Sequence, residues 1–241
     1  MEVILRFFLN AHQYPKHIVL VLIVCFFYNK EVFAQEFLKP QEPMQFIPLE
    51  ILKYEVFVRE AFHDAFSDDT LLGVVVMESF EKEYVLYVNK EKKSSYLYFK
   101  QAESNYWNGF KKIKYPKPIV VCRMKLENEI ENALDNIWRG ELLNARYTKN
   151  ITGMMDGTRY SFYVNNSVDP DNFMVPKSAM QGETQSPEAD SRMGRFVKLT
   201  NELKTSCTNN GLNVEASKLM QEFELLHRQS KRIPRTPTPI N

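Results

Sequence analysis

Four short runs of β-branched and aromatic residues in the middle of the chain constrain its fold more than any other feature. They are interrupted by charged or polar connections, and they cover residues 71–80, 83–88, 95–100 and 118–126. Parallel neighbours would need a crossover helix between strands, and these connections look too short to hold one. The sequence therefore predicts an antiparallel meander.

Segments with helical periodicity lie before and after these strands in the sequence. Apolar side chains within residues 127–146 form one stripe opposite acidic and amide side chains, which predicts an amphipathic helix lying on the sheet. A helical pair with a turn at Gly211 follows near the C-terminus. A further helix is expected over residues 49–66, although the alternation at 53–58 also fits a strand. We therefore predict an α+β fold: an antiparallel sheet of about four to six strands, packed by one central amphipathic helix and a C-terminal helical pair.

Two segments connect the middle of the chain to the helical pair. Residues 145–151 and 158–164 flank Asp156-Gly157, a strong turn signal, and predict a β-hairpin. Residues 165–190 contain prolines and polar residues without a period, which predicts a long loop that is either functional or mobile.

The ends of the domain are marked by proline. Residues 35–48 contain prolines and no period, which indicates an extended arm. Residues 230–241 are basic and proline-rich and predict a disordered, unpacked tail. A single α+β domain is therefore expected over residues 49–229.

The first 34 residues resemble a secretory signal peptide in their order of charge and hydropathy. The apolar run from Ile18 to Tyr28 follows the basic residues Arg6 and Lys16, and small residues lead to a cleavage site after Ala34. Eleven apolar residues fall short of the roughly 20 that a membrane-spanning helix needs. We expect a periplasmic or secreted protein that contacts a membrane only through its leader before cleavage. An envelope structural protein held by an uncleaved leader is the alternative.

Cleavage also changes the charge and the cysteine content. Residues 1–34 hold three of the 31 basic and two of the 30 acidic residues, so the mature chain is electrically balanced. A balanced chain creates no broad field for a polyanion, which argues against nucleic acid as a partner. Cys122 and Cys207 remain, and an oxidising compartment would allow them to form a disulfide. Two buried thiols that never meet are the alternative.

Catalytic signatures are missing from the sequence. It has no glycine-rich dinucleotide motif, no Cys-x-x-Cys, no His-Glu-x-x-His and no Gly-x-Ser-x-Gly, so we expect neither a cofactor nor a metal. Glu81 and Glu83 lie two residues apart and would share a side of an extended segment, as a general acid and base would require. His63 stands beside several carboxylates, but their spacing fits no calcium loop. A secreted hydrolase using Glu81 and Glu83, or His63, is therefore the enzymatic alternative.

A binding surface is easier to support. Tyr106 and Trp107 precede the basic pair Lys111 and Lys112, and this mixture could stack on a sugar or contact a partner protein. The competing interpretation is an outer sheet face whose lysines protect an edge. We expect a non-catalytic, exported binding or inhibitor-like interaction protein with a protein or glycan partner.

Overall fold

The structure is a computed structural model, and it describes residues 37–40, 48–78, 80–113, 116–146, 157–165 and 180–230. The predicted leader and residues 231–241 of the predicted tail lie outside these ranges. The described residues belong to one compact unit. No helix within them has the length and apolar character needed to cross a bilayer.

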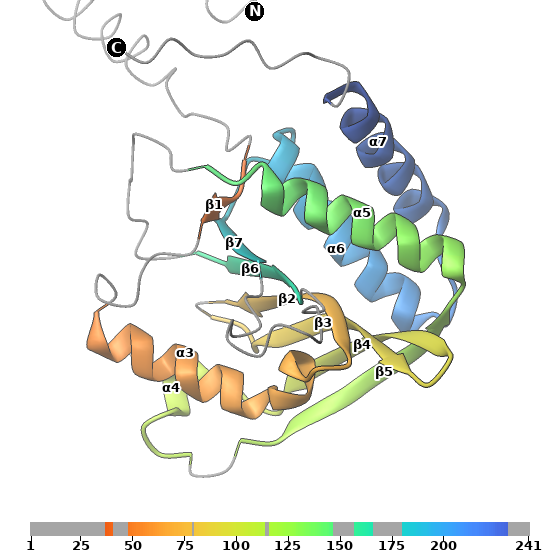
Figure 1. Cartoon of the computed structure of the whole chain (residues 1–241). Helices are drawn as coiled ribbons and strands as arrows, with labels where there is room; N and C mark the ends of the chain where they lie inside the picture. Colours follow the sequence, from red (N-terminus) through yellow and green to blue (C-terminus); the bar gives the residue numbers. More distant parts are fainter. Residues whose placement is uncertain are drawn as a thin grey trace, which may run out of the picture. The chain divides into compact units, whose positions relative to one another are not determined.

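A seven-stranded antiparallel sheet forms the centre of the fold (Figure 1), so the predicted α+β class is confirmed and the strand count slightly exceeds the prediction. In space the strands follow the order β1-β7-β6-β2-β3-β4-β5. Their bounds are Lys39–Pro40 (β1), Thr70–Met77 (β2), Tyr84–Glu91 (β3), Ser94–Ala102 (β4), Pro118–Leu126 (β5), Arg159–Val164 (β6) and Met180–Gln185 (β7).

The predicted meander is the run from β2 to β5, in which each strand pairs with the next one along the chain. Its tightest connection is the two-residue turn at Lys92 and Lys93, where Lys92 has a φ of 57°. The register shifts where Phe99 faces Cys122 and Lys100 faces Val120, which leaves Val121 as the extra residue of a β-bulge.

The predicted hairpin between residues 145–151 and 158–164 is wrong. Strand β6 has β2 on one side and β7 on the other, so both of its edges are already paired. Ala145 and Arg146 belong to no strand, and residues 147–156 lie outside the described ranges. Residues 159–164 therefore pair with β2 and β7 and not with residues 145–151.

Strand β7 lies inside the segment that was predicted to be a loop, residues 165–190. Its sequence, MQGETQ, has almost no β-branched or aromatic residues, so its pairing with β6 and β1 depends on tertiary context. Gly182 permits this packing, because an added Cβ there would lie 3.1 Å from both Leu142 and Leu38. Residues 166–179 of the predicted loop lie outside the described ranges.

Part of the predicted extended arm, residues 35–48, belongs to the sheet. Lys39 and Pro40 form β1 against β7, and the preceding Leu38 is fully buried in the core. The Leu38 carbonyl also accepts a bond from the backbone N–H of Arg146, at 2.8 Å. The domain therefore begins before residue 49.

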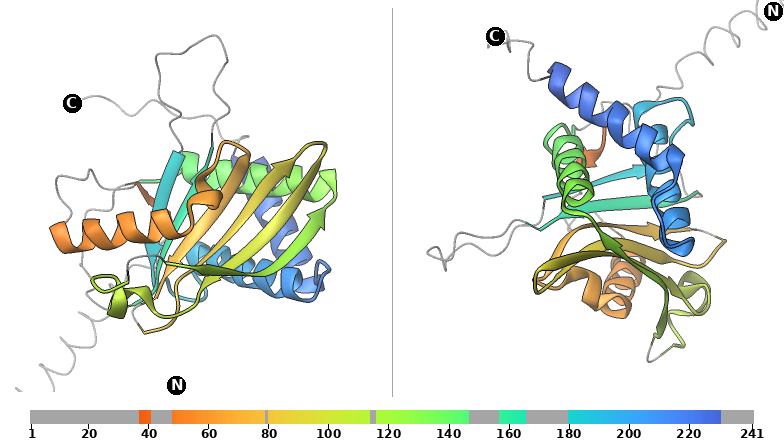
Figure 2. Two further views of the ribbon diagram at one scale, coloured as in Figure 1. Left: turned by 90° about the horizontal axis from the view of Figure 1, so that it is seen from below. Right: turned by 90° about the vertical axis from the view of Figure 1, so that its right-hand side faces the viewer.

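Three helices cover one face of the sheet: α5 (Asn128–Leu143), α6 (Arg192–Thr208) and α7 (Val214–Ser230) (Figures 1 and 2). They confirm the predicted central helix and the C-terminal helical pair. Trp138 of α5 is buried at their centre, where its ring lies 4.8 Å from that of Phe196. Its indole N–H donates to the carbonyl of Gly73 on β2 at 3.1 Å, which satisfies the one polar atom of a buried Trp.

The opposite face carries helix α3 (Leu49–Ala61) and a 3-10 turn (His63–Phe66), so the predicted helix is confirmed and the competing strand over 53–58 is wrong. Tyr54, Val58 and Phe62 point from these segments into a second core. There they meet apolar side chains of β2, β3 and β6, including Tyr163, whose hydroxyl donates to the carbonyl of Ala65 at 2.7 Å.

Two cross-links hold the helical layer in place. The sulfur atoms of Cys122 on β5 and Cys207 on α6 lie 2.00 Å apart, at disulfide-bonding distance, and their Cα atoms are 5.9 Å apart. The fully buried Glu141 of α5 pairs with Arg192 of α6 at 2.8 Å, and one of its oxygens lies 3.2 Å from Nε2 of His227 on α7. The disulfide thus joins sheet to helix, and Glu141 joins all three helices.

Candidate binding surface

The segment with the predicted binding residues folds into a single helical turn, α4 (Tyr106–Gly109), which follows β4. Asn105 caps this turn, because its side-chain oxygen accepts a bond from the N–H of Asn108 at 2.9 Å. A turn this short has no stability of its own, so other parts of the protein must hold it in place.

Glu83, the residue that precedes β3, provides that support. Its side chain is fully buried and accepts bonds from the backbone N–H groups of Tyr106, at 2.7 Å, and Trp107, at 2.9 Å. The Tyr54 hydroxyl of α3 donates to the same carboxylate at 2.6 Å. Burial, and then this bond, raise the pKa of Tyr54 well above its usual range, so the hydroxyl remains a donor. Glu83 therefore joins α3, β3 and α4.

Trp107 packs against neighbouring aromatic rings on one side and is exposed to solvent on the other. Its ring meets the Tyr54 ring edge-on at 4.9 Å and stacks on Phe110 at 5.9 Å, yet 41% of the residue remains exposed. Tyr106 differs, because it is buried against Phe57 and Phe62, and this burial raises its pKa to about 12. Tyr106 thus supports the surface from within and offers no contact of its own.

The lysines lie at the border of this aromatic group. Lys111 pairs with Glu50 of α3 at 2.8 Å and lies 5.8 Å from the centre of the Phe110 ring, while Lys112 is exposed. A shallow hollow between α3 and α4 continues the surface. We call these residues the α3–α4 surface: apolar Val56, Phe57, Trp107 and Phe110, with Glu50, Lys53, Lys111 and Lys112 around them.

The sequence had not singled out Val56, Phe57 or Phe110 as surface residues. Val56 is 45% exposed although it lies in the middle of an amphipathic helix, and it is turned away from the sheet. A helical projection of residues 49–61 would have shown Val56 outside the apolar stripe that holds Tyr54 and Val58. Phe110 could have been found as the aromatic residue between Trp107 and Lys111.

The two carboxylates predicted to work as a pair differ in their exposure to solvent. Glu81 is exposed, whereas Glu83 is buried and occupied by its three donors. No substrate could reach the Glu83 carboxylate without displacing Tyr54 or α4. This geometry gives Glu83 a structural role, and its use as an acid or base with Glu81 stays a prediction.

His63 lies on the 3-10 turn and is exposed to solvent. Its side chain is 78% exposed, and its Nε2 lies 2.6 Å from an oxygen of Asp64. Asp64 also pairs with the buried Lys100, whose hydrogen bond lowers the pKa of the Asp64 carboxyl. Within the described ranges, no cluster of three or more His, Cys, Asp or Glu side chains could hold a metal ion.

Comparison with known proteins assigns the chain to no family. No protein-family model matches the chain, and neither a curated protein nor a solved structure is similar to it at a significant level. A function must therefore be inferred from the side chains of this chain, and the α3–α4 surface offers the most specific arrangement.

Proposed function

We propose that the protein is exported and binds a partner protein, without catalysis, through the α3–α4 surface. The observation that carries this proposal is Trp107, a half-exposed ring fixed by Glu83, Tyr54 and Phe110. Trp is enriched among the residues that contribute most to protein interfaces, above all when it needs little ordering on binding. The surrounding charges have both signs, which suits the polar rim of a protein interface better than a polyanion site.

Export is supported by two independent features. The N-terminal 34 residues have the charge and hydropathy of a cleavable leader, and the Cys122–Cys207 pair lies at disulfide distance. Such a bond persists in the periplasm or outside the cell, whereas cytosolic thiols are kept reduced.

Cleavage of the leader can be tested on the protein purified from its native host. Intact mass and N-terminal sequencing should show a mature chain that starts at Gln35, recovered without detergent. A full-length chain in the membrane fraction would contradict this expectation and favour the envelope protein with an uncleaved leader.

Replacement of Trp107 by Ala should weaken partner binding by about 2 kcal/mol or more, roughly thirtyfold, because the ring supplies the rigid apolar centre of the surface. Lys112→Glu should slow association and make it less sensitive to salt. The partner would be captured by crosslinking from the extracellular or periplasmic fraction, identified by mass spectrometry and titrated against each variant.

Matched controls lie on α7, across the sheet from α3. Leu225→Ala removes an exposed apolar side chain, and Lys218→Glu reverses an exposed charge, so both should bind the partner like the unaltered protein. All four variants should retain the same circular dichroism spectrum. Capture of the same partner at equal strength by Trp107→Ala would overturn the proposal.

A further inference from the structure

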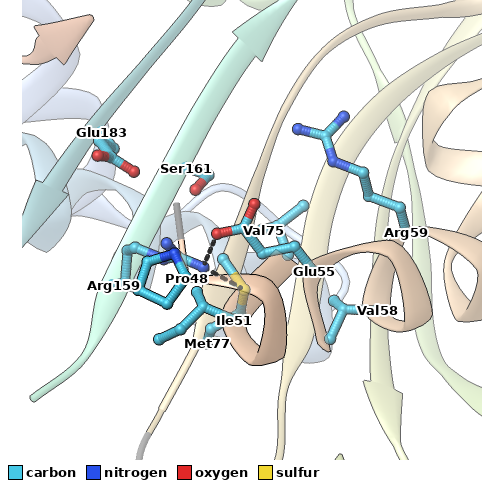
Figure 3. Close-up of a pocket in the computed structure, with 10 residues that line it drawn as sticks. All are labelled: Pro48, Ile51, Glu55, Val58, Arg59, Val75, Met77, Arg159, Ser161 and Glu183. Carbon is cyan, nitrogen blue, oxygen red and sulfur yellow. Dashed lines mark hydrogen bonds and ion pairs between the residues drawn. The ribbon is translucent and has the colours of Figure 1, made fainter. Parts of the chain in front are cut away.

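A second site lies on a different flank of α3, where the helix passes over β2, β6 and β7 (Figure 3). It is a cavity of about 200 Å³. Its polar lining comes from three elements: Glu55 and Arg59 of α3, Arg159 and Ser161 of β6, and Glu183 of β7. From this arrangement we propose that the cavity binds one uncharged sugar ring.

An ion pair closes one end of the cavity. Arg159 pairs with Glu55 at 2.6 Å, and its guanidinium also lies 3.4 Å from the sulfur of Met77. One oxygen of Glu55 makes this pair, and Figure 3 shows the Glu55 carboxylate between Arg159 and Arg59. The second oxygen can accept a hydrogen bond from a ligand.

Arg59 closes the other end. Its guanidinium donates to the side-chain oxygen of Gln181 at 3.0 Å and lies 5.2 Å from the centre of the Phe66 ring. A guanidinium has five N–H donors, and the bond to Gln181 uses one of them, so Arg59 can also donate to a ligand. Burial lowers the pKa of Arg59, because the protein displaces water that would otherwise solvate the cation.

Ser161 creates the space between these two ends. Arg159, Ser161 and Tyr163 follow one another on the same face of β6, and residues two apart on a strand are separated by about 7 Å. Ser161 is the small residue between two large ones, and the register places it opposite Glu183 of β7. A hydroxyl and a carboxylate therefore line the floor midway between the two arginines.

The charges select the class of ligand. Two arginines and two glutamates line the cavity, so its formal charge is balanced and favours neither an anion nor a cation. Guanidinium groups only donate hydrogen bonds and carboxylates only accept them, whereas each sugar hydroxyl does both. Vicinal hydroxyls on one ring can therefore satisfy the alternating donors and acceptors.

The apolar lining residues and the volume of the cavity suit a single sugar ring. Ile51, Val58 and Val75 provide apolar contacts for the C–H face of a sugar. A cavity of about 200 Å³ holds roughly seven waters at about 30 Å³ each, which suits one ring and leaves no room for a second. A free monosaccharide or the terminal unit of a longer chain would present this same chemistry.

The test uses the purified protein and follows its backbone amides by NMR. D-glucose, D-galactose and D-mannose serve as neutral probes, while D-glucuronate and D-glucosamine carry one negative and one positive charge. At least one neutral sugar should bind with a dissociation constant on the order of 1 mM, with saturable shifts at Ser161 and Gln181. Both charged relatives should bind more weakly. Maltotriose distinguishes the sources: tighter binding than glucose indicates a chain end, and weaker binding a free sugar.

Variants locate the site. Arg59→Met should weaken binding roughly tenfold or more because it removes a charged donor, and Ser161→Leu should abolish binding by filling the space. Arg123→Met, at the far edge of the sheet, is the matched control and should bind normally. Absence of saturable shifts with every neutral sugar, tighter binding of a charged relative, or binding unaffected by both cavity variants would overturn the proposal. Because the probes do not involve Trp107, these outcomes are independent of the proposed protein partner.

Discussion

Reduction of the bond between Cys122 and Cys207 should lower the free energy of unfolding by about 4–5 kcal/mol. The bond closes a loop of 85 sequence positions and so removes many conformations from the unfolded chain. It also joins β5, at one edge of the sheet, to α6 in the helical layer. Urea unfolding of the oxidised and reduced protein, followed by circular dichroism, measures the difference.

The double variant Cys122→Ser with Cys207→Ser separates the bond from other effects of the reductant. This variant should be less stable than the oxidised protein, and its unfolding midpoint should not respond to reductant. Replacement of the buried Cys207 by Ser also places a hydroxyl in the core, so Cys122→Ala with Cys207→Ala should lie closer to the reduced protein. Two reactive thiols in the denatured, unreduced protein would contradict the prediction.

The elements that could be predicted from the sequence are those whose local pattern and tertiary environment agree. Strand β5 begins at Pro118 and ends at Leu126, as predicted, because a β-rich run is bounded by proline and by the cap of α5. Strand β7 could not be predicted, because its MQGETQ sequence becomes a strand only between β6 and β1. Its partner β1 is two residues long, which is too short for any periodicity.

The candidate surface could be predicted from the sequence only in part, because some of its side chains are positioned by distant residues. Trp107 and Lys112 stand out as an aromatic and a basic residue in a polar segment, and both are exposed. Tyr106 was predicted beside them as a contact, but it points into the core because α4 is fixed through its backbone. The direction of each side chain depends on Glu83, which lies 23 positions from Tyr106 in sequence. No local pattern encodes a contact of that kind.

Replacement of Glu83 by Ala should lower the free energy of unfolding by about 3–5 kcal/mol, because two buried donors and one part-buried donor lose their acceptor. Each loss costs about 1–3 kcal/mol, and water can enter to satisfy some of the donors. Glu83→Gln should have a smaller effect, since the amide keeps one acceptor but places an NH₂ group against the other donors. Glu81→Ala is the matched control and should leave stability within about 0.5 kcal/mol.

A double-mutant cycle isolates the contact that joins α3 to this group. Tyr54→Phe removes the hydroxyl and keeps the ring that supports Trp107, so its combination with Glu83→Ala measures the Tyr54–Glu83 bond alone. We expect a coupling of about 1–2 kcal/mol, together with loss of the ordered Trp107 indole signal in every variant lacking Glu83. If Glu83→Ala costs under about 1 kcal/mol and leaves that signal unchanged, then α4 is held by its aromatic contacts instead, and the exposed Trp107 ring owes its position to Tyr54 and Phe110.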